Sequence, residues 1–155
     1  MVRLSTMSGP EHSFIHVYLL PQLRALSPQL KRVEDPAAIN TERISEAIEL
    51  AAARAGARSE REVYAGRLPP RQGRRKQPGR LDLMVRERDG TTYAVEIDRE
   101  NKLWSVDKLR HVADSVGWIP VWVRWREQIK VELPRDILVI DMCHWEVQVF
   151  PAQED

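Results

Sequence analysis

The chain has 155 residues, and its 24 lysines and arginines against 23 aspartates and glutamates give a formal net charge of +1. This length argues for one domain with a buried core, and the charge balance excludes a strongly basic nucleic-acid coat and an acidic disordered chain. No apolar stretch approaches the length of about 18 residues that spans a membrane, and the N-terminus lacks the apolar core of a signal peptide. A single cysteine excludes an internal disulfide. We therefore expect a cytoplasmic protein that has no membrane partner.

Positive charge is concentrated in one stretch of the chain. Residues 58–90 hold ten basic and five acidic side chains, whereas residues 91–155 hold eight basic and twelve acidic ones. The density is greatest over residues 67–80, where proline and glycine are mixed with six basic residues: Arg67, Arg71, Arg74, Arg75, Lys76 and Arg80. Proline and glycine disfavour a helix or a central strand here, which predicts a mobile basic loop. The loop is either a solvated linker or an arm that binds phosphate groups through its guanidinium groups.

The first third of the chain predicts helices. Residues 12–30 have a helical pattern that Pro21 interrupts, which predicts one kinked helix or two short ones. Asn40 or Thr41 is expected to cap the next helix, because short polar side chains accept hydrogen bonds from the first free N–H groups. Gly56 is expected to end that helix.

The middle of the chain predicts strands. Residues 60–68 form a short candidate strand, and residues 80–88 alternate between apolar and polar side chains. The predicted apolar face of the second strand carries Leu81, Leu83 and Val85. Asp89-Gly90 is a two-residue hairpin signal, so residues 91–98 are expected to return as the antiparallel partner strand.

The last third predicts a helix followed by three strands. Ser105 is expected to cap a helix that runs to Val116 and ends at Gly117. Its predicted buried stripe is formed by Val106, Leu109, Val112, Ala113 and Val116. Three further strands are expected over residues 119–125, 137–142 and 145–150, the last two as a terminal hairpin.

The order of these elements predicts a single α/β domain with a mixed β-sheet flanked by helices. Within it, we expect residues 1–39 to form a helical extension, residues 40–126 the core, and residues 127–155 the C-terminal strands.

Three carboxylates on the central hairpin are the candidate chemistry. Glu96 and Asp98 project from one strand face because side chains alternate along a strand, and the turn places Asp82 opposite roughly residues 94–98. Converging carboxylates raise one another's pKa, and a hard divalent cation such as Mg²⁺ removes the conflict. Two acids spaced in this way are also common on strands that face solvent.

The chain resembles the PD-(D/E)XK nuclease superfamily in this region. The residues concerned are Gly79-Arg80-Leu81-Asp82-Leu83-Met84-Val85 and Tyr93-Ala94-Val95-Glu96-Ile97-Asp98, followed by the predicted helix and strand. The family has an acidic residue on one strand and Glu/Asp-x-Lys on the next. The resemblance covers roughly residues 40–125 and implies the restriction-endonuclease-like fold, a mixed sheet with an αβββαβ core.

The resemblance also implies the ligands of a Mg²⁺ or Mn²⁺ ion. Asp82 and Glu96 match the two acidic positions, and the backbone carbonyl of Ile97 is a further ligand in that family. A carboxylate from the preceding helix sometimes assists. The candidates here are Glu46, which we prefer, and Glu42.

The third position of the motif departs from the family pattern. Asp98 stands where the family has a lysine that positions the attacking water and neutralises developing charge. Asp98 can instead hold a second metal ion. Lys102 or Lys108 can supply the missing ammonium group, because a lysine stem spans several ångströms.

Two functions follow from this pattern. The first is a divalent-metal-dependent nuclease that hydrolyses DNA phosphodiester bonds and holds the DNA backbone with the basic loop. The alternative is a catalytically reduced module of the same fold that binds nucleic acid or a protein partner. The missing lysine favours the second function, and the three acids favour the first. A homodimer is a further expectation, because the family is often dimeric and cutting two DNA strands needs two sites. The sequence has no glycine-rich phosphate-binding loop, so we expect no organic cofactor.

Overall fold

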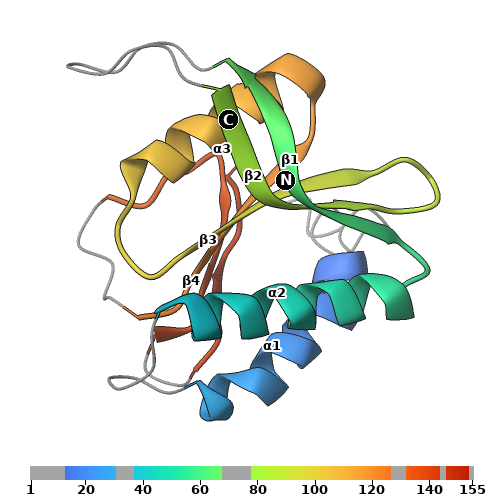
Figure 1. Cartoon of the computed structure of the whole chain (residues 1–155), viewed down its shortest axis with the longest axis vertical. Helices are drawn as coiled ribbons and strands as arrows, with labels where there is room; N and C mark the ends of the chain where they lie inside the picture. Colours follow the sequence, from blue (N-terminus) through green and yellow to red (C-terminus); the bar gives the residue numbers. More distant parts are fainter. Residues whose placement is uncertain (1–12, 31–36, 68–77, 127–131, 144–145, 154–155) are drawn as a thin grey trace, which may run out of the picture.

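The computed structural model describes residues 13–30, 37–67, 78–126, 132–143 and 146–153. It is an α/β fold in which a six-stranded mixed sheet lies between helices on both faces (Figure 1). The helices are α1 (Leu20–Leu26), α2 (Ala37–Arg54) and α3 (Leu103–Val116), with a π-helical turn at Phe14–Leu19 and a 3-10 turn at Ser27–Gln29 on either side of α1. The strands are β1 (Arg58–Arg67), β2 (Pro78–Arg86), β3 (Thr92–Asp98), β4 (Ile119–Arg124), β5 (Leu138–Asp141) and β6 (Gln148–Phe150).

The strands lie in the sheet in the order of the sequence. β1, β2 and β3 are antiparallel neighbours, and β4 and β5 then run parallel to β3. β6 pairs antiparallel with β5, as expected for the terminal hairpin. The predicted mixed sheet with flanking helices is therefore confirmed.

The N-terminal helices differ from prediction in where they begin. Pro21 lies at the start of α1, directly after the π-helical turn. Proline is tolerated in the first turn of a helix, so the helical path continues past it in two consecutive segments. The prediction that Asn40 or Thr41 caps α2 is wrong, because α2 begins at Ala37 and Asn40 is buried within it. Gly56 ends α2 as predicted, with a φ of +69° that favours glycine.

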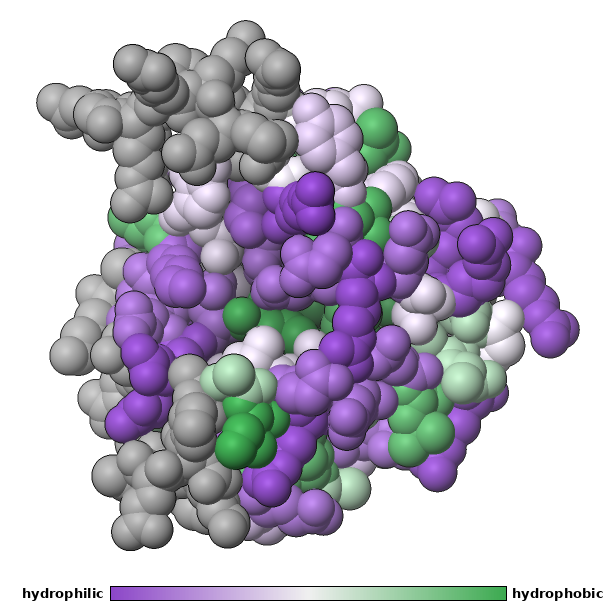
Figure 2. Space-filling model, in the orientation of Figure 1, coloured by the Kyte–Doolittle hydropathy of each residue, from purple (hydrophilic) through white to green (hydrophobic). Residues whose placement is uncertain are grey.

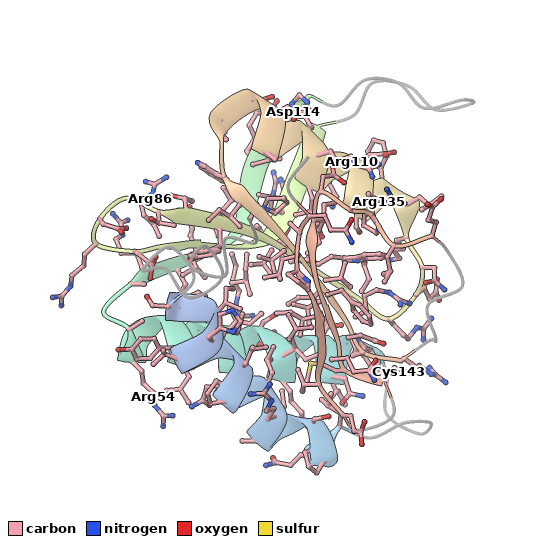
Figure 3. The ribbon with its side chains drawn as sticks, turned by 180° about the vertical axis from the view of Figure 1, so that it is seen from behind. Arg54, Arg86, Arg110, Asp114, Arg135 and Cys143 are labelled. Carbon is pink, nitrogen blue, oxygen red and sulfur yellow. The ribbon has the colours of Figure 1, made fainter. Side chains whose placement is uncertain are left out.

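The β2–β3 hairpin is antiparallel as predicted, but its loop has three residues. Glu87 and Thr91 are joined by a hydrogen bond from the N–H of Glu87 to the carbonyl of Thr91 (2.8 Å). Gly90, with a φ of +95°, completes the turn. A type I turn followed by a left-handed residue is the common solution for a loop of this length. Figure 3 shows Arg86, beside this turn, on the opposite side of the molecule from Cys143, which follows β5.

Helix α3 begins at Leu103 with Lys102 in the capping position, so the prediction that Ser105 is the cap is wrong. Gly117 ends the helix as predicted, with a φ of +71°. Val116 is 59 % exposed, which removes it from the predicted buried stripe. Val106, Leu109 and Val112 are buried against the sheet as predicted.

The sheet has an apolar core on each face. The core on one face joins α1 and α2 to the odd-numbered residues of β3, and the core on the other face joins α3 to Ala94 of β3. β3 is consequently buried on both faces. Leu83 and Val85 lie in the first core, but Leu81 lies in the second, so the prediction of one shared face is wrong for Leu81.

The exterior differs from this core in composition. The face shown in Figure 2 is mainly hydrophilic, and apolar residues occur there as small separate areas. No helix within the described ranges is both long and apolar enough to cross a membrane.

Candidate functional site

The candidate site lies where β2 separates from β3. Pairing between these strands ends at Leu83 and Val95, whereas β2 stays paired with β1 beyond that point (Figure 1). Asp82 is the first residue after the separation. Its Oδ2 accepts a hydrogen bond from the backbone N–H of Ile97 (2.8 Å), which replaces a bond between the two strands. This hydrogen bond fixes the Asp82 carboxylate at the fork between β2 and β3.

Glu96 and Asp98 point from β3 toward α3. Their exposed fractions are 2 % and 5 %, because α3 covers this face of the sheet. The solvent-facing interpretation of these acids is therefore wrong, and burial gives their ionisation an energetic cost.

Glu96 is the more strongly perturbed acid. The pKa of Glu96 is raised to about 9, mainly by burial, and the neighbouring Asp82 carboxylate contributes by repulsion and by hydrogen bonding. The Lys108 ammonium acts in the opposite direction. Glu96 therefore holds its proton at neutral pH.

Lys108 is the lysine that reaches these carboxylates. Its Nζ lies 2.5 Å from Oε1 of Glu96 and donates a hydrogen bond to the backbone carbonyl of Arg80 (3.0 Å). Its side chain is 13 % exposed. Lys102, in contrast, is exposed and caps the start of α3. Of the two candidate lysines, Lys108 is therefore the one that the structure places beside Glu96.

Asp98 has other partners. Its Oδ2 accepts a hydrogen bond from the indole Nε1 of Trp122 (2.8 Å), and its carboxylate also bonds to the hydroxyl of Ser105 in α3. Burial raises the pKa of Asp98, and these two hydrogen bonds lower it. Asp98 thus links β3, β4 and α3, and these hydrogen bonds give no support to its predicted role as a ligand of a second metal.

The structure does not bring the predicted helix carboxylates to this site. Glu42 and Glu46 lie on α2, which packs on the other face of the sheet from Glu96. Glu42 is paired with Arg61 of β1 (2.7 Å), which lowers its pKa, and Glu46 is exposed. The expectation that Glu46 assists the metal is therefore corrected, because α2 holds Glu46 on the opposite face of the sheet from Glu96.

Most of the predicted phosphate-binding arm lies outside the described residues. Arg67 ends β1, and Arg80 is exposed near the start of β2, so both belong to strands and not to a loop. The other residues of the predicted arm fall in the undescribed range: Arg71, Arg74, Arg75 and Lys76. The Ile97 carbonyl stays a predicted ligand.

Sequence reasoning missed Arg124 and the role of Trp122. Arg124 is fully buried on β4, in register between Asp98 of β3 and Asp141 of β5. Its guanidinium carbon lies 5.0 Å from the centroid of the Trp122 ring. Arginine and aspartate on neighbouring parallel strands were the available signal, but the strand pattern does not show that they are buried.

Asp82 and Glu96 are the carboxylates nearest Lys108, and the Asp82 carboxylate also acts on Asp98 by raising its pKa. Across the ranges that the structure describes, no group of three or more histidine, cysteine, aspartate or glutamate side chains is arranged to hold a metal ion. Comparison of the chain with protein-family models, curated proteins and solved structures found no match.

Proposed function

We propose that the chain is a divalent-metal-dependent nuclease that hydrolyses DNA phosphodiester bonds. The observation that carries this proposal is the convergence of Asp82, Glu96 and Lys108 at the fork between β2 and β3. Two carboxylates and one ammonium group on rigid elements are the side chains that phosphodiester hydrolysis with a divalent ion requires.

The order of the elements supports the restriction-endonuclease-like form of this proposal. A helix (α2) precedes three antiparallel strands, α3 follows them, and β4 then runs parallel to β3. This is the αβββαβ arrangement that the motif resemblance implies. Asp82 and Glu96 occupy the second and third strands, where that resemblance places the acidic residues.

The residues present fit a Mg²⁺ or Mn²⁺ ion. Mg²⁺ usually binds one or two protein carboxylates and keeps several waters, so Asp82 and Glu96 suffice as side-chain ligands. Burial and the neighbouring Asp82 carboxylate oppose the ionisation of Glu96, and a cation at this position would relieve that opposition. When bound, such an ion activates water and stabilises negative charge on a phosphodiester.

The chain's own residues have distinct tasks in the reaction. The oxygen of a water molecule bonds to phosphorus, one P–O ester bond breaks, and one proton of that water ends on the leaving oxygen, so the products are a phosphomonoester and a free hydroxyl group. Asp82 is held in place by the Ile97 N–H, and the Lys108 ammonium lies close enough to the carboxylates to neutralise charge on the phosphate. Asp98 maintains the orientation of α3, from which Lys108 extends.

The alternative is a catalytically reduced module that binds nucleic acid or a protein partner. The ion pair between Lys108 and Glu96 favours it, because this ammonium compensates the acidic site without any metal. In this case the fold and the exposed basic residues would be used, and cleavage would not occur.

A cleavage assay separates the two functions. Supercoiled plasmid and single-stranded DNA are incubated with Mg²⁺ or Mn²⁺. Each reaction contains one protein, which is the parent, the Asp82→Asn variant or the Glu96→Gln variant. Asp114→Asn is the matched control, because Asp114 is an exposed acid on the same helix as Lys108 (Figure 3).

We expect the parent and Asp114→Asn to cut DNA and the two site variants to lose at least about 10²-fold in rate, the scale of removing one group that stabilises the transition state. DNA binding without cleavage by the parent would support the module. Equal cleavage by all four proteins would exclude Asp82 and Glu96 as the site.

A further inference from the structure

The atoms around the Lys108 ammonium are those that a hard divalent cation binds. The Nζ atom contacts a carboxylate oxygen, Oε1 of Glu96 at 2.5 Å, and a backbone carbonyl oxygen, that of Arg80 at 3.0 Å. Carboxylate and carbonyl oxygens are the preferred ligands of such cations. The carboxylate belongs to β3 and the carbonyl to β2, so the ammonium bridges the two strands at the point where they separate.

Two features make this interaction more than a surface ion pair. Glu96 and Lys108 are 2 % and 13 % exposed, so water screens their interaction weakly. Asp82 adds a second carboxylate beside Glu96, as its effect on Glu96 shows. The ammonium is thus the cation that the described residues supply to a buried acidic site.

We propose that Lys108 is an internal cation that competes with the divalent ion for Glu96. A metal ion that takes Glu96 as a ligand displaces the ammonium from Oε1, and the lysine then turns toward the bound phosphate. This inference rests on the proposed function, and it adds that Lys108 opposes metal binding while it promotes cleavage.

The position of Lys108 allows this exchange. The residue lies on α3, and Leu109 beside it is buried against the sheet, so the helix stays in place when the side chain moves. A lysine side chain has a flexible four-carbon stem, so its head can move several ångströms from a fixed backbone. The displaced ammonium therefore remains next to the site, where it can pair with a phosphate oxygen.

The test measures metal affinity and cleavage separately. Isothermal titration with Mn²⁺, without DNA, compares the parent with Lys108→Met and Lys108→Gln, and plasmid cleavage is measured on the same preparations. Lys102→Met is the matched control for affinity, because it removes an exposed lysine from the start of the same helix. Circular dichroism confirms folding, and Lys108→Gln, which keeps a polar end group, carries the comparison if Lys108→Met does not fold.

Removing Lys108 should tighten Mn²⁺ binding by about tenfold, since a like charge at close range in a poorly screened site opposes a cation. Cleavage should fall by about 10²-fold in the same variants. Lys102→Met should change affinity less than about twofold because its charge is screened by solvent. A structural role for Lys108 would instead weaken metal binding together with cleavage.

The outcomes separate this inference from the proposed function. Mn²⁺ binding that needs Glu96 but is unchanged or weaker without Lys108 would overturn the inference and leave the nuclease standing. Mn²⁺ binding that Glu96→Gln does not affect, together with no cleavage by the parent, would overturn both.

Discussion

Glu96 should make the stability of the fold depend on pH. Burial, with a contribution from the Asp82 carboxylate, raises the pKa of its carboxyl group from 4.5 to about 9. Because the folded-state pKa lies above the unfolded value, the folded chain holds the proton more tightly. The resulting stabilisation is complete below the unfolded pKa and is lost as the pH rises toward the folded pKa.

The size of this effect follows from proton linkage. Between the two pKa values, the free energy of unfolding falls by at most about 1.4 kcal/mol per pH unit, the value for one proton held only by the folded chain. Lys108 favours the charged form of Glu96, and this effect is already part of the folded-state pKa of about 9, so it narrows the pH range of the slope and not its size. Neutral pH is about two units from both pKa values, so we expect a slope close to about 1.4 kcal/mol per pH unit from this group.

Urea unfolding at several pH values measures the slope directly. Glu96→Gln keeps the shape and donor capacity of the protonated carboxyl group but does not titrate, so its stability relative to the parent should rise with pH. Glu100→Gln is the control, because Glu100 is a solvent-accessible acid close by in the sequence with a lowered pKa. Parallel stability curves for the parent and Glu96→Gln would refute the argument that burial dominates at Glu96.

Two further predictions concern Asp98 and the basic loop. Trp122→Phe removes the indole N–H that Asp98 Oδ2 accepts at 2.8 Å and should lower the free energy of unfolding in urea by about 1–3 kcal/mol, the cost of an unsatisfied buried acceptor; a decrease no larger than that of Trp118→Phe would contradict it. Replacing Arg74, Arg75 and Lys76 with glutamine should weaken DNA binding and lower the slope of log affinity against log salt by about 0.9 for each phosphate group that the variant no longer neutralises. Fluorescence anisotropy across a salt series measures this, and an unchanged slope would identify the loop as a linker.

The sequence predicted the features that local patterns determine. Asp89-Gly90 located the hairpin, and strand alternation placed Glu96 and Asp98 on one face. Gly117 marked the end of α3 because a left-handed residue there favours glycine. Reflection about the turn also brought Asp82 to β3, where it binds the Ile97 N–H.

Features that depend on packing could not be predicted in this way. Leu81 lies in the core on the α3 side of the sheet, unlike Leu83 and Val85. The pairing of β2 with β3 ends at Leu83, and strand alternation does not predict where such pairing ends. Arg124 is fully buried on β4, but the alternation of that strand does not distinguish it from an exposed arginine. The choice between Lys102 and Lys108 depended on how α3 is rotated against the sheet and on where the helix begins, which a sequence pattern locates only to within a residue or two.

The aspartate at position 98 and the lysine at position 108 are explained together by the surroundings of β3. Asp98 lies in register with the buried Arg124 and accepts the Trp122 N–H. A lysine at position 98 would place a second buried cation beside that guanidinium and would leave the indole donor without its acceptor, both at an energetic cost. The ammonium group beside Glu96 instead comes from another element. Helix α3 covers this face of β3, and Lys108, in the second turn of α3, reaches Glu96.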